Sequence, residues 1–151
     1  MFSKEFFTKA QKEAIKTAIE AAELNTSGEI RVHVDNKCAI NPKEKAVQVF
    51  EKLKMHKTEL RNGVLIYLAV KDKKLAIVGD QGIDAAVKDD FWDQIKNNLV
   101  ENFKKGRYTE GLVEGIHASG EQLKAHFPYQ EDDVNELSNE ISFGDEPEES
   151  K

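Results

Sequence analysis

The stretch GVLIYLAVKDKKLAIVG, residues 63–79, decides the fold of this chain. Its first eight residues, 63–70, are apolar on both faces, which is typical of a central strand covered on both sides. The polar KDKK that follows predicts a tight turn, and KLAIVG, residues 74–79, predicts a strand that pairs back as a hairpin. The core is therefore expected to contain a buried strand with an antiparallel neighbour.

Further strands and helices are predicted on either side of this hairpin. Upstream, EIRVHVDN at residues 29–36 alternates apolar and polar side chains, which predicts a strand with one better-buried face. Apolar spacing of three and four residues predicts four helices, over residues 4–23 with Ser3 as N-cap, from Pro42 to about His56, over residues 90–105, and from Thr109 to Phe127. This order predicts an α/β sheet with helices on both faces.

The composition describes a soluble globular class. The 151 residues are 39% hydrophobic and 33% charged, which fits one domain with its own core. The longest apolar run, residues 64–70, is too short to span a bilayer, and the N-terminus carries no pattern of a secretion signal. With Cys38 as the single cysteine, we expect a cytoplasmic monomer with no membrane span.

The negative charge is concentrated near the C-terminal end. Residues 130–151 hold nine acidic residues and one lysine, a net charge of −8 against −6 for the whole chain. We therefore predict an α/β domain over residues 1–128 and an acidic, largely disordered tail over residues 129–151. This acidity argues against nucleic-acid binding, which needs a basic surface.

A second reading of the tail stays open. Val134, Leu137 and Ile141 fall three and four residues apart within acidic surroundings, as in an amphipathic helix, and Phe143 follows them. Such a pattern can dock on the domain itself or in the groove of a protein partner. The tail is therefore either solvated chain or a docking segment.

Four polar residues near the hairpin are candidate ligands for a divalent cation. Asp80 follows the strand at residues 74–79, in the region where ligands of open α/β sheets bind. Asp84 and Asp90 lie in the next turn and at the next helix start, and Asn62 precedes the central strand. Because antiparallel partners share an edge, Asn62 and Asp80 are expected to lie close together. Oxygen ligands of this kind suit Ca²⁺ or Mg²⁺.

A structural reading of the same residues stays open. Asp90 is well placed to act as N-cap of the helix that follows it, and Asp84 to cap the short turn. The sequence contains no glycine-rich phosphate loop and no H-E-x-x-H motif. His33 is expected to be half exposed on the polar face of its strand, Trp92 to be a core anchor, and the Tyr67 hydroxyl to need a partner.

Several segments together carry a family resemblance. They are TSGEIRVHV (26–34), RNGVLIYLAV (61–70), KLAIVGDQGIDAAVKDDFW (74–92) and FKKGRYTEGLVEGI (103–116). In this order they resemble the TPM domain family, from about residue 5 to residue 127. The resemblance implies a three-layer α/β/α sandwich with a short central mixed sheet flanked by helices.

The same resemblance has functional implications. The family has been associated with weak acid phosphatase activity and with divalent cations at acidic residues near one sheet edge. Carried over to this chain, the acidic positions are Asp80, Asp84 and Asp90, with Asn62 beside them.

Two functions from different classes follow. The first is a binding or regulatory module that holds a divalent cation or a protein partner, with the acidic tail as one candidate contact. The alternative is a weak divalent-cation-dependent acid phosphatase, a phosphomonoester hydrolase. In it, bound Ca²⁺ or Mg²⁺ polarises a phosphoryl oxygen and activates water.

Overall fold

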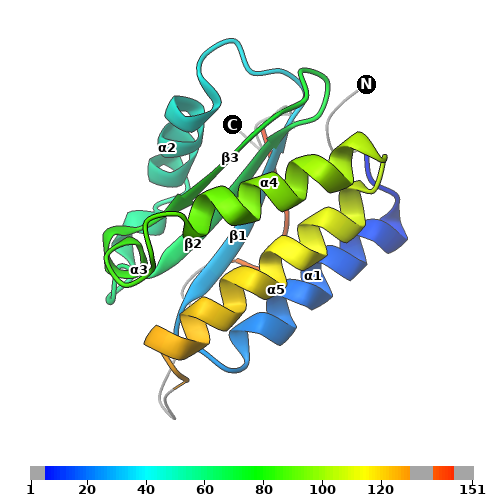
Figure 1. The fold of residues 1–151 in the computed structure, drawn as a ribbon. Coiled ribbons are helices and arrows are strands. Elements are labelled where there is room, and N and C mark those ends of the chain that lie inside the picture. The colour runs from blue at the N-terminus through cyan, green and yellow to red at the C-terminus, as the bar shows by residue number, and fades with distance from the viewer. Residues whose placement is uncertain (1–5, 130–137, 145–151) are drawn as a thin grey trace, which may run out of the picture.

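The computed structural model describes residues 6–129 and 138–144 (Figure 1). Figure 1 labels most of its elements, which follow the predicted order with three additions, η2, α3 and β4. In chain order they are α1 (Lys9–Glu23), β1 (Glu29–Asp35), α2 (Pro42–Lys52), the 3₁₀ turn η2 (Met55–Lys57), β2 (Gly63–Ala69), β3 (Lys74–Gly79), α3 (Gln81–Asp84), α4 (Phe91–Lys104), α5 (Tyr108–His126) and β4 (Ser142–Phe143).

The sheet is mixed and has the strand order β3-β2-β1-β4. β1 and β2 run parallel, from Glu29 opposite Gly63 to Asp35 opposite Ala69. β2 and β3 pair antiparallel, which confirms the predicted hairpin. Every residue of β2 is buried, as expected for a strand inside a sheet that is covered on both faces.

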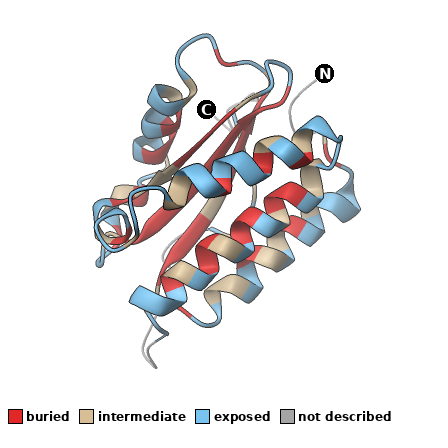
Figure 2. Ribbon diagram, viewed as in Figure 1, coloured by how far each residue is buried: buried red, intermediate tan, exposed pale blue. Residues whose placement is uncertain are grey.

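Helices cover both faces of this sheet. α1, α4 and α5 lie side by side over one face, and α2 lies over the other (Figure 1). The side chains of β2 alternate between the two cores, since Ile66 packs on the three-helix side while Leu65 and Tyr67 pack on the α2 side. Figure 2 shows the strands buried between helices whose outer surfaces are exposed. The predicted three-layer α/β/α sandwich is confirmed.

The first helix begins later than the sequence pattern predicted. α1 starts at Lys9, with Thr8 as its N-cap. Thr8 Oγ1 accepts a hydrogen bond from Gln11 N at 3.1 Å, and Gln11 Oε1 accepts one from Thr8 N at 2.9 Å, which is a capping box. The predicted start at residue 4 is therefore wrong, and Ser3 lies outside the described residues.

No helix in the described part of the chain has the length and apolar character needed to cross a membrane.

The last two long helices lie close to their predicted positions. Gly106 has a φ of 74° after the end of α4, the left-handed conformation expected of a helix terminator. α5 begins at Tyr108, so Thr109 lies inside the helix rather than capping it. A Cβ on Gly120 would lie 2.8 Å from the Ala22 Cβ, which shows how closely α5 approaches α1.

α2 ends at Lys52, a turn earlier than predicted.

Residues 138–144 dock on the domain as an additional strand. β4 pairs in parallel with β1 and extends the sheet at that edge. Ile141 and Phe143 pack against the core on the three-helix side. Lys16 Nζ lies 2.7 Å from Glu140 Oε1, so an ion pair joins the segment to α1.

Of the two readings of the tail, docking is the one that residues 138–144 show. The other two apolar positions of the pattern, Val134 and Leu137, lie outside the described residues. Residues 145–151, which hold the last acidic side chains, also lie outside them.

The docking of this segment requires a residue without a side chain at position 144, which is Gly144. A Cβ at this position would collide with Asp35 Oδ1, and the Gly144 N–H donates to Val34 O at 3.1 Å. We expect Gly144→Ala to detach β4 and to lower the free energy of unfolding by about 1 kcal/mol. Urea denaturation and amide exchange at Phe143 measure both effects. Glu140→Gln is the matched control, because losing an exposed ion pair should change the free energy of unfolding little; equal losses in both variants would contradict the prediction.

Candidate functional site

Asn62 and Asp80 lie at the end of the sheet where β1 and β2 begin and β3 ends, while Asp84 ends α3 and Asp90 precedes α4. Asp80 N donates to Gly63 O at 2.8 Å, and Glu29 N donates to Asn62 O at 3.4 Å. These bonds confirm that Asn62 and Asp80 lie at one edge. We refer to Asn62, Asp80, Asp84 and Asp90 together as the acidic edge.

Asp80 is buried and bound by an arginine. Arg61 Nε donates to Asp80 Oδ2 at 2.7 Å and Arg61 Nη2 donates to Asp80 Oδ1 at 2.9 Å, a bidentate pair. Asp80 is also the N-cap of α3, because its Oδ1 accepts from Gln81 N. Asp80 is 6% exposed, whereas the Arg61 side chain is 39% exposed. The hydrogen bond to Asp80 raises the pKa of Arg61. A surface guanidinium thus neutralises a buried carboxylate.

The backbone around Arg61 is held tightly. Arg61 has a left-handed φ of 52°, which is uncommon for a residue other than glycine. Its carbonyl accepts a hydrogen bond from Gly82 N at 2.8 Å. A Cβ on Gly82 would lie 2.6 Å from Arg61 O and closer still to Leu60 O. Because Gly82 has no side chain, α3 can pack directly against the backbone of the loop that carries Arg61.

Asp84 is bound by the only tryptophan in the chain. Trp92 Nε1 donates to Asp84 Oδ1 at 2.9 Å. The indole ring also lies against the end of β3, since a Cβ on Gly79 would collide with it. Trp92 is only partly buried, so it links the core to the acidic edge rather than acting only as the predicted core anchor. Asp84 ends α3 and does not begin it, so the predicted capping role belongs to Asp80.

The remaining two residues of the acidic edge also have partners of their own. Asp90 Oδ2 accepts from Gln94 Nε2 at 2.8 Å; Asp90 occupies the N-cap position of α4 but makes no side-chain cap hydrogen bond, unlike the predicted cap. Asn62 is 1% exposed, and its Nδ2 lies 3.5 Å from Ser27 Oγ. Within residues 6–129 and 138–144, no group of three or more His, Cys, Asp or Glu side chains could hold a metal ion. The cation site stays a prediction.

A pocket of about 330 Å³ opens beside Asp80, between α2 and the end of β3. Arg61, Asp80, His56 and Glu51 are the charged and titratable residues in its lining. His56 Nδ1 is buried and has no hydrogen-bond partner. Arg61 and His56 therefore line the same cavity, while the unsatisfied Nδ1 of His56 is itself buried.

A pair of carboxyl groups lies at the same end of β1. Glu29 is 2% exposed, and Glu23 Oε2 accepts from Ile30 N at 2.8 Å. Burial raises the pKa of Glu23 to about 8; the Ile30 hydrogen bond opposes this rise, and the charge of Glu29 adds to it. Glu23 is therefore protonated at neutral pH. No local pattern in the sequence singles out this pair, because its members come from a helix end and a strand start.

His33 belongs to a hydrogen-bonded chain in the interior. Its Nδ1 lies 2.9 Å from Ser142 Oγ, and its Nε2 lies 2.9 Å from Asp35 Oδ1. Tyr67 donates its hydroxyl to Asp35 Oδ2 at 2.7 Å, which supplies the partner that this tyrosine was expected to need. Burial raises the pKa of Asp35, but hydrogen bonds from His33 and Tyr67 outweigh it and lower the pKa. His33 is 6% exposed, so the prediction of a half-exposed histidine is wrong.

The sequence and the fold agree with one known family. The family profile of the TPM domain matches residues 2–122. The BA42 protein of the psychrophilic bacterium Bizionia argentinensis, solved by NMR, is 49% identical, with a TM-score of 0.86 over 92% of this chain and 96% of that one. No curated protein sequence matches the chain.

Two more distant structures share the fold. The N-terminal domain of a P. gingivalis protein is 19% identical, with a TM-score of 0.66 over 82% of each chain. The N-terminal domain of a Corynebacterium glutamicum protein is 14% identical, with a TM-score of 0.62 over 78% of this chain and 74% of that one. At these identities the likeness concerns the fold alone.

Proposed function

The chain belongs to the TPM domain family, and from that premise we propose that it is a binding or regulatory module whose acidic edge takes a divalent cation, Ca²⁺ or Mg²⁺. One observation carries this proposal. The buried Asp80 carboxylate has as its counter-ion a partly exposed arginine side chain, Arg61. A buried carboxylate needs a positive partner, and a bound cation can take the place of a side chain that is partly exposed.

The cation would replace the guanidinium rather than fill an empty cage. Arg61 would turn toward solvent and leave both Asp80 oxygens to the ion. Asp84 lies one helical turn away, because Asp84 N donates to Asp80 O at 2.9 Å. Its Oδ1 accepts from Trp92, and its other oxygen is available as a ligand. Since binding competes with the Arg61 pair, we expect dissociation constants near a millimolar, as in weak calcium modules.

The test is a titration of isotope-labelled protein with Ca²⁺ and then Mg²⁺, followed by NMR and by the fluorescence of Trp92. We expect the amides of Asn62 and of residues 79–91 to shift together and saturate. Removing the competitor in Arg61→Ala should tighten binding roughly three- to tenfold, by the loss of one ion pair. Asp80→Asn should abolish the saturable response.

Arg107→Ala is the matched control, because Arg107 is exposed and lies before α5, away from the acidic edge. It should bind the cation as the original protein does. Amides that stay in place in both the original protein and Arg61→Ala would overturn the proposal. In that case the aspartates serve only as caps and as partners of Arg61 and Trp92.

A second candidate is divalent-cation-dependent phosphomonoester hydrolysis. It is favoured by the pocket beside Asp80, where Arg61 offers a cationic group suited to a phosphate. Hydrolysis of p-nitrophenyl phosphate with Mg²⁺ tests it. Turnover should saturate with substrate and disappear when Asp80 and Asp84 are both replaced by Asn; turnover that survives this change comes from elsewhere.

A further inference from the structure

β3 forms an edge of the sheet, and no other strand within residues 6–129 and 138–144 pairs with its outer side. Asp80 N donates to Gly63 O, so the even-numbered residues of β3 bond to β2. In an antiparallel pair the backbone groups alternate between the two sides. The N–H and C=O groups of Leu75, Ile77 and Gly79 therefore point away from the sheet, as an extended peptide would need.

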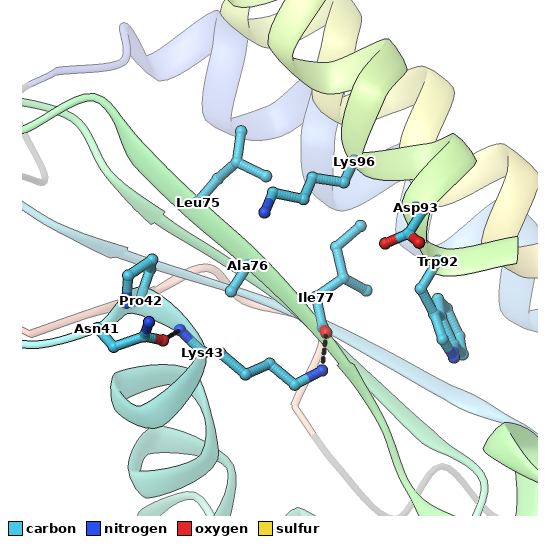
Figure 3. Close-up of a pocket in the computed structure, with 9 residues that line it drawn as sticks. All are labelled: Asn41, Pro42, Lys43, Leu75, Ala76, Ile77, Trp92, Asp93 and Lys96. Carbon is cyan, nitrogen blue, oxygen red and sulfur yellow. Dashed lines mark hydrogen bonds between the residues drawn. The ribbon is translucent and has the colours of Figure 1, made fainter. Parts of the chain in front are cut away.

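A groove of about 310 Å³ runs along this edge between α2 and α4 (Figure 3). Its floor is the buried, apolar stretch Leu75, Ala76 and Ile77. Pro42 at the start of α2 and Trp92 at the start of α4 form its sides. The two helices cover the faces of the sheet but leave its edge open between them.

A lysine already makes one of the hydrogen bonds that an added strand would make. Lys43 Nζ donates to Ile77 O at 3.1 Å, as the dashed line in Figure 3 shows. Edge lysines discourage strand pairing in many proteins, and Lys43 fits that role when the groove is vacant. Because Lys43 is exposed and flexible, an incoming backbone N–H can replace it at Ile77 O. Its freed ammonium group then needs an acidic partner.

The surroundings of the groove are basic although the protein is acidic. Lys43 and Lys96 line it, and in Figure 3 both amino groups extend over β3 from opposite helices, against one acidic lining residue, Asp93. The adjoining turn, residues 71–74, adds three lysines and one aspartate. An extended segment with acidic side chains would meet complementary charge in this groove.

The opposite edge of the sheet shows how such a segment is held. There β4 pairs with β1 over only two residues, and an acidic side chain, Glu140, reaches Lys16 on α1. The Lys12 ammonium lies 5.4 Å from the centre of the Phe143 ring. A short ladder, an apolar side chain and lysine contacts are therefore sufficient to dock a strand on this sheet.

We infer that the groove along β3 is a strand-addition site for an extended segment of a partner protein that alternates apolar and acidic residues. Its backbone pairs with Leu75 and Ile77. Its apolar side chains face α4 and pack beside Trp92, and its acidic side chains face α2, where Lys43 lies. Lys96 adds positive charge at the α4 side of the groove. Main-chain hydrogen bonds supply affinity and the side chains supply selectivity. This inference does not depend on the cation proposed for the acidic edge.

Two synthetic peptides with blocked ends, SEIEIES and SKIKIKS, test the inference in buffer containing EDTA. With isotope-labelled protein, SEIEIES should shift the amides of Leu75, Ile77 and Gly79 in a saturable way. SKIKIKS should bind at least tenfold more weakly. Replacing Lys43 and Lys96 together by Glu should reverse this preference.

The control with the same change in charge replaces Lys104 and Lys124, which are exposed at the ends of α4 and α5, by Glu. It should keep the preference for SEIEIES. The inference is overturned if the β3 amides do not respond, if the control loses binding as the test variant does, or if the shifts fall on β1 instead. Shifts of β3 that depend on protein concentration without peptide would also overturn it, since a second copy would then be the occupant.

Discussion

Replacing Gly82 by alanine should lower the free energy of unfolding by about 3 kcal/mol. The new Cβ would lie 2.6 Å from Arg61 O and closer still to Leu60 O, which are backbone atoms that cannot rotate away. The loop could retreat only by lengthening the Gly82 N to Arg61 O hydrogen bond and by moving Arg61 from Asp80. Urea denaturation followed by circular dichroism measures the loss.

Gly115→Ala is the matched control for this substitution. A Cβ on Gly115 would lie 3.5 Å from Leu99 Cδ2, an ordinary van der Waals distance. Because Gly115 lies inside α5, alanine should leave stability unchanged or raise it by up to about 1 kcal/mol. Similar losses in Gly82→Ala and Gly115→Ala would show that the contact with the Arg61 loop is not the cause.

The stability of the protein should fall as pH rises from about 5 to about 8, because folding places Glu23 in a partly buried position that favours its protonated form. The pKa of Glu23 is raised to about 8 from an ordinary value of 4.5. Its contribution is complete below the ordinary value and is lost as the pH approaches the raised one. Glu23→Gln keeps a neutral acceptor for Ile30 N, so it should remove this slope. At pH 8 we expect the variant to be more stable by about 2 kcal/mol.

Urea denaturation at pH 5 and pH 8 measures both parts of this prediction. Glu13→Gln, farther toward the start of the same helix, is the control because Glu13 is exposed. It should keep the slope of the original protein. The explanation by a proton held on Glu23 fails if Glu23→Gln has the same pH dependence as Glu13→Gln.

Hydrophobic periodicity was sufficient to predict the layers of the fold. The continuous apolar run of β2 and the turn after it left one reasonable pairing, and the helices on each side had clear apolar stripes. The ends of the helices were harder to predict than their existence, because an end depends on single hydrogen bonds. The capping box of Thr8 and Gln11 can be recognised in the sequence. Phe6 and Phe7, however, continue the apolar stripe before it, so the predicted start of the helix was too early.

The position of the acidic edge could be predicted from the sequence, but the side-chain contacts of its residues could not. Antiparallel pairing alone brings Asn62 and Asp80 to one edge, and the structure confirms that. The contacts of Arg61 with Asp80 and of Trp92 with Asp84 depend on side-chain rotamers and on the left-handed backbone conformation of Arg61. No periodic pattern in the sequence predicts either. His33 is buried beside β4, a strand of two residues, and no sequence pattern near His33 predicts that this strand pairs there.

The covering of β1 by β4 has a consequence for the synthesis of the protein. His33 and Ser142 are separated by 109 positions. At about 5 to 20 residues per second, a ribosome needs roughly 5 to 20 s to make that length of chain. Until Ser142 is made, the outer side of β1 lacks β4, and an unpaired strand edge is a template for pairing with another nascent chain. A chain released before Ser142 would carry that open edge.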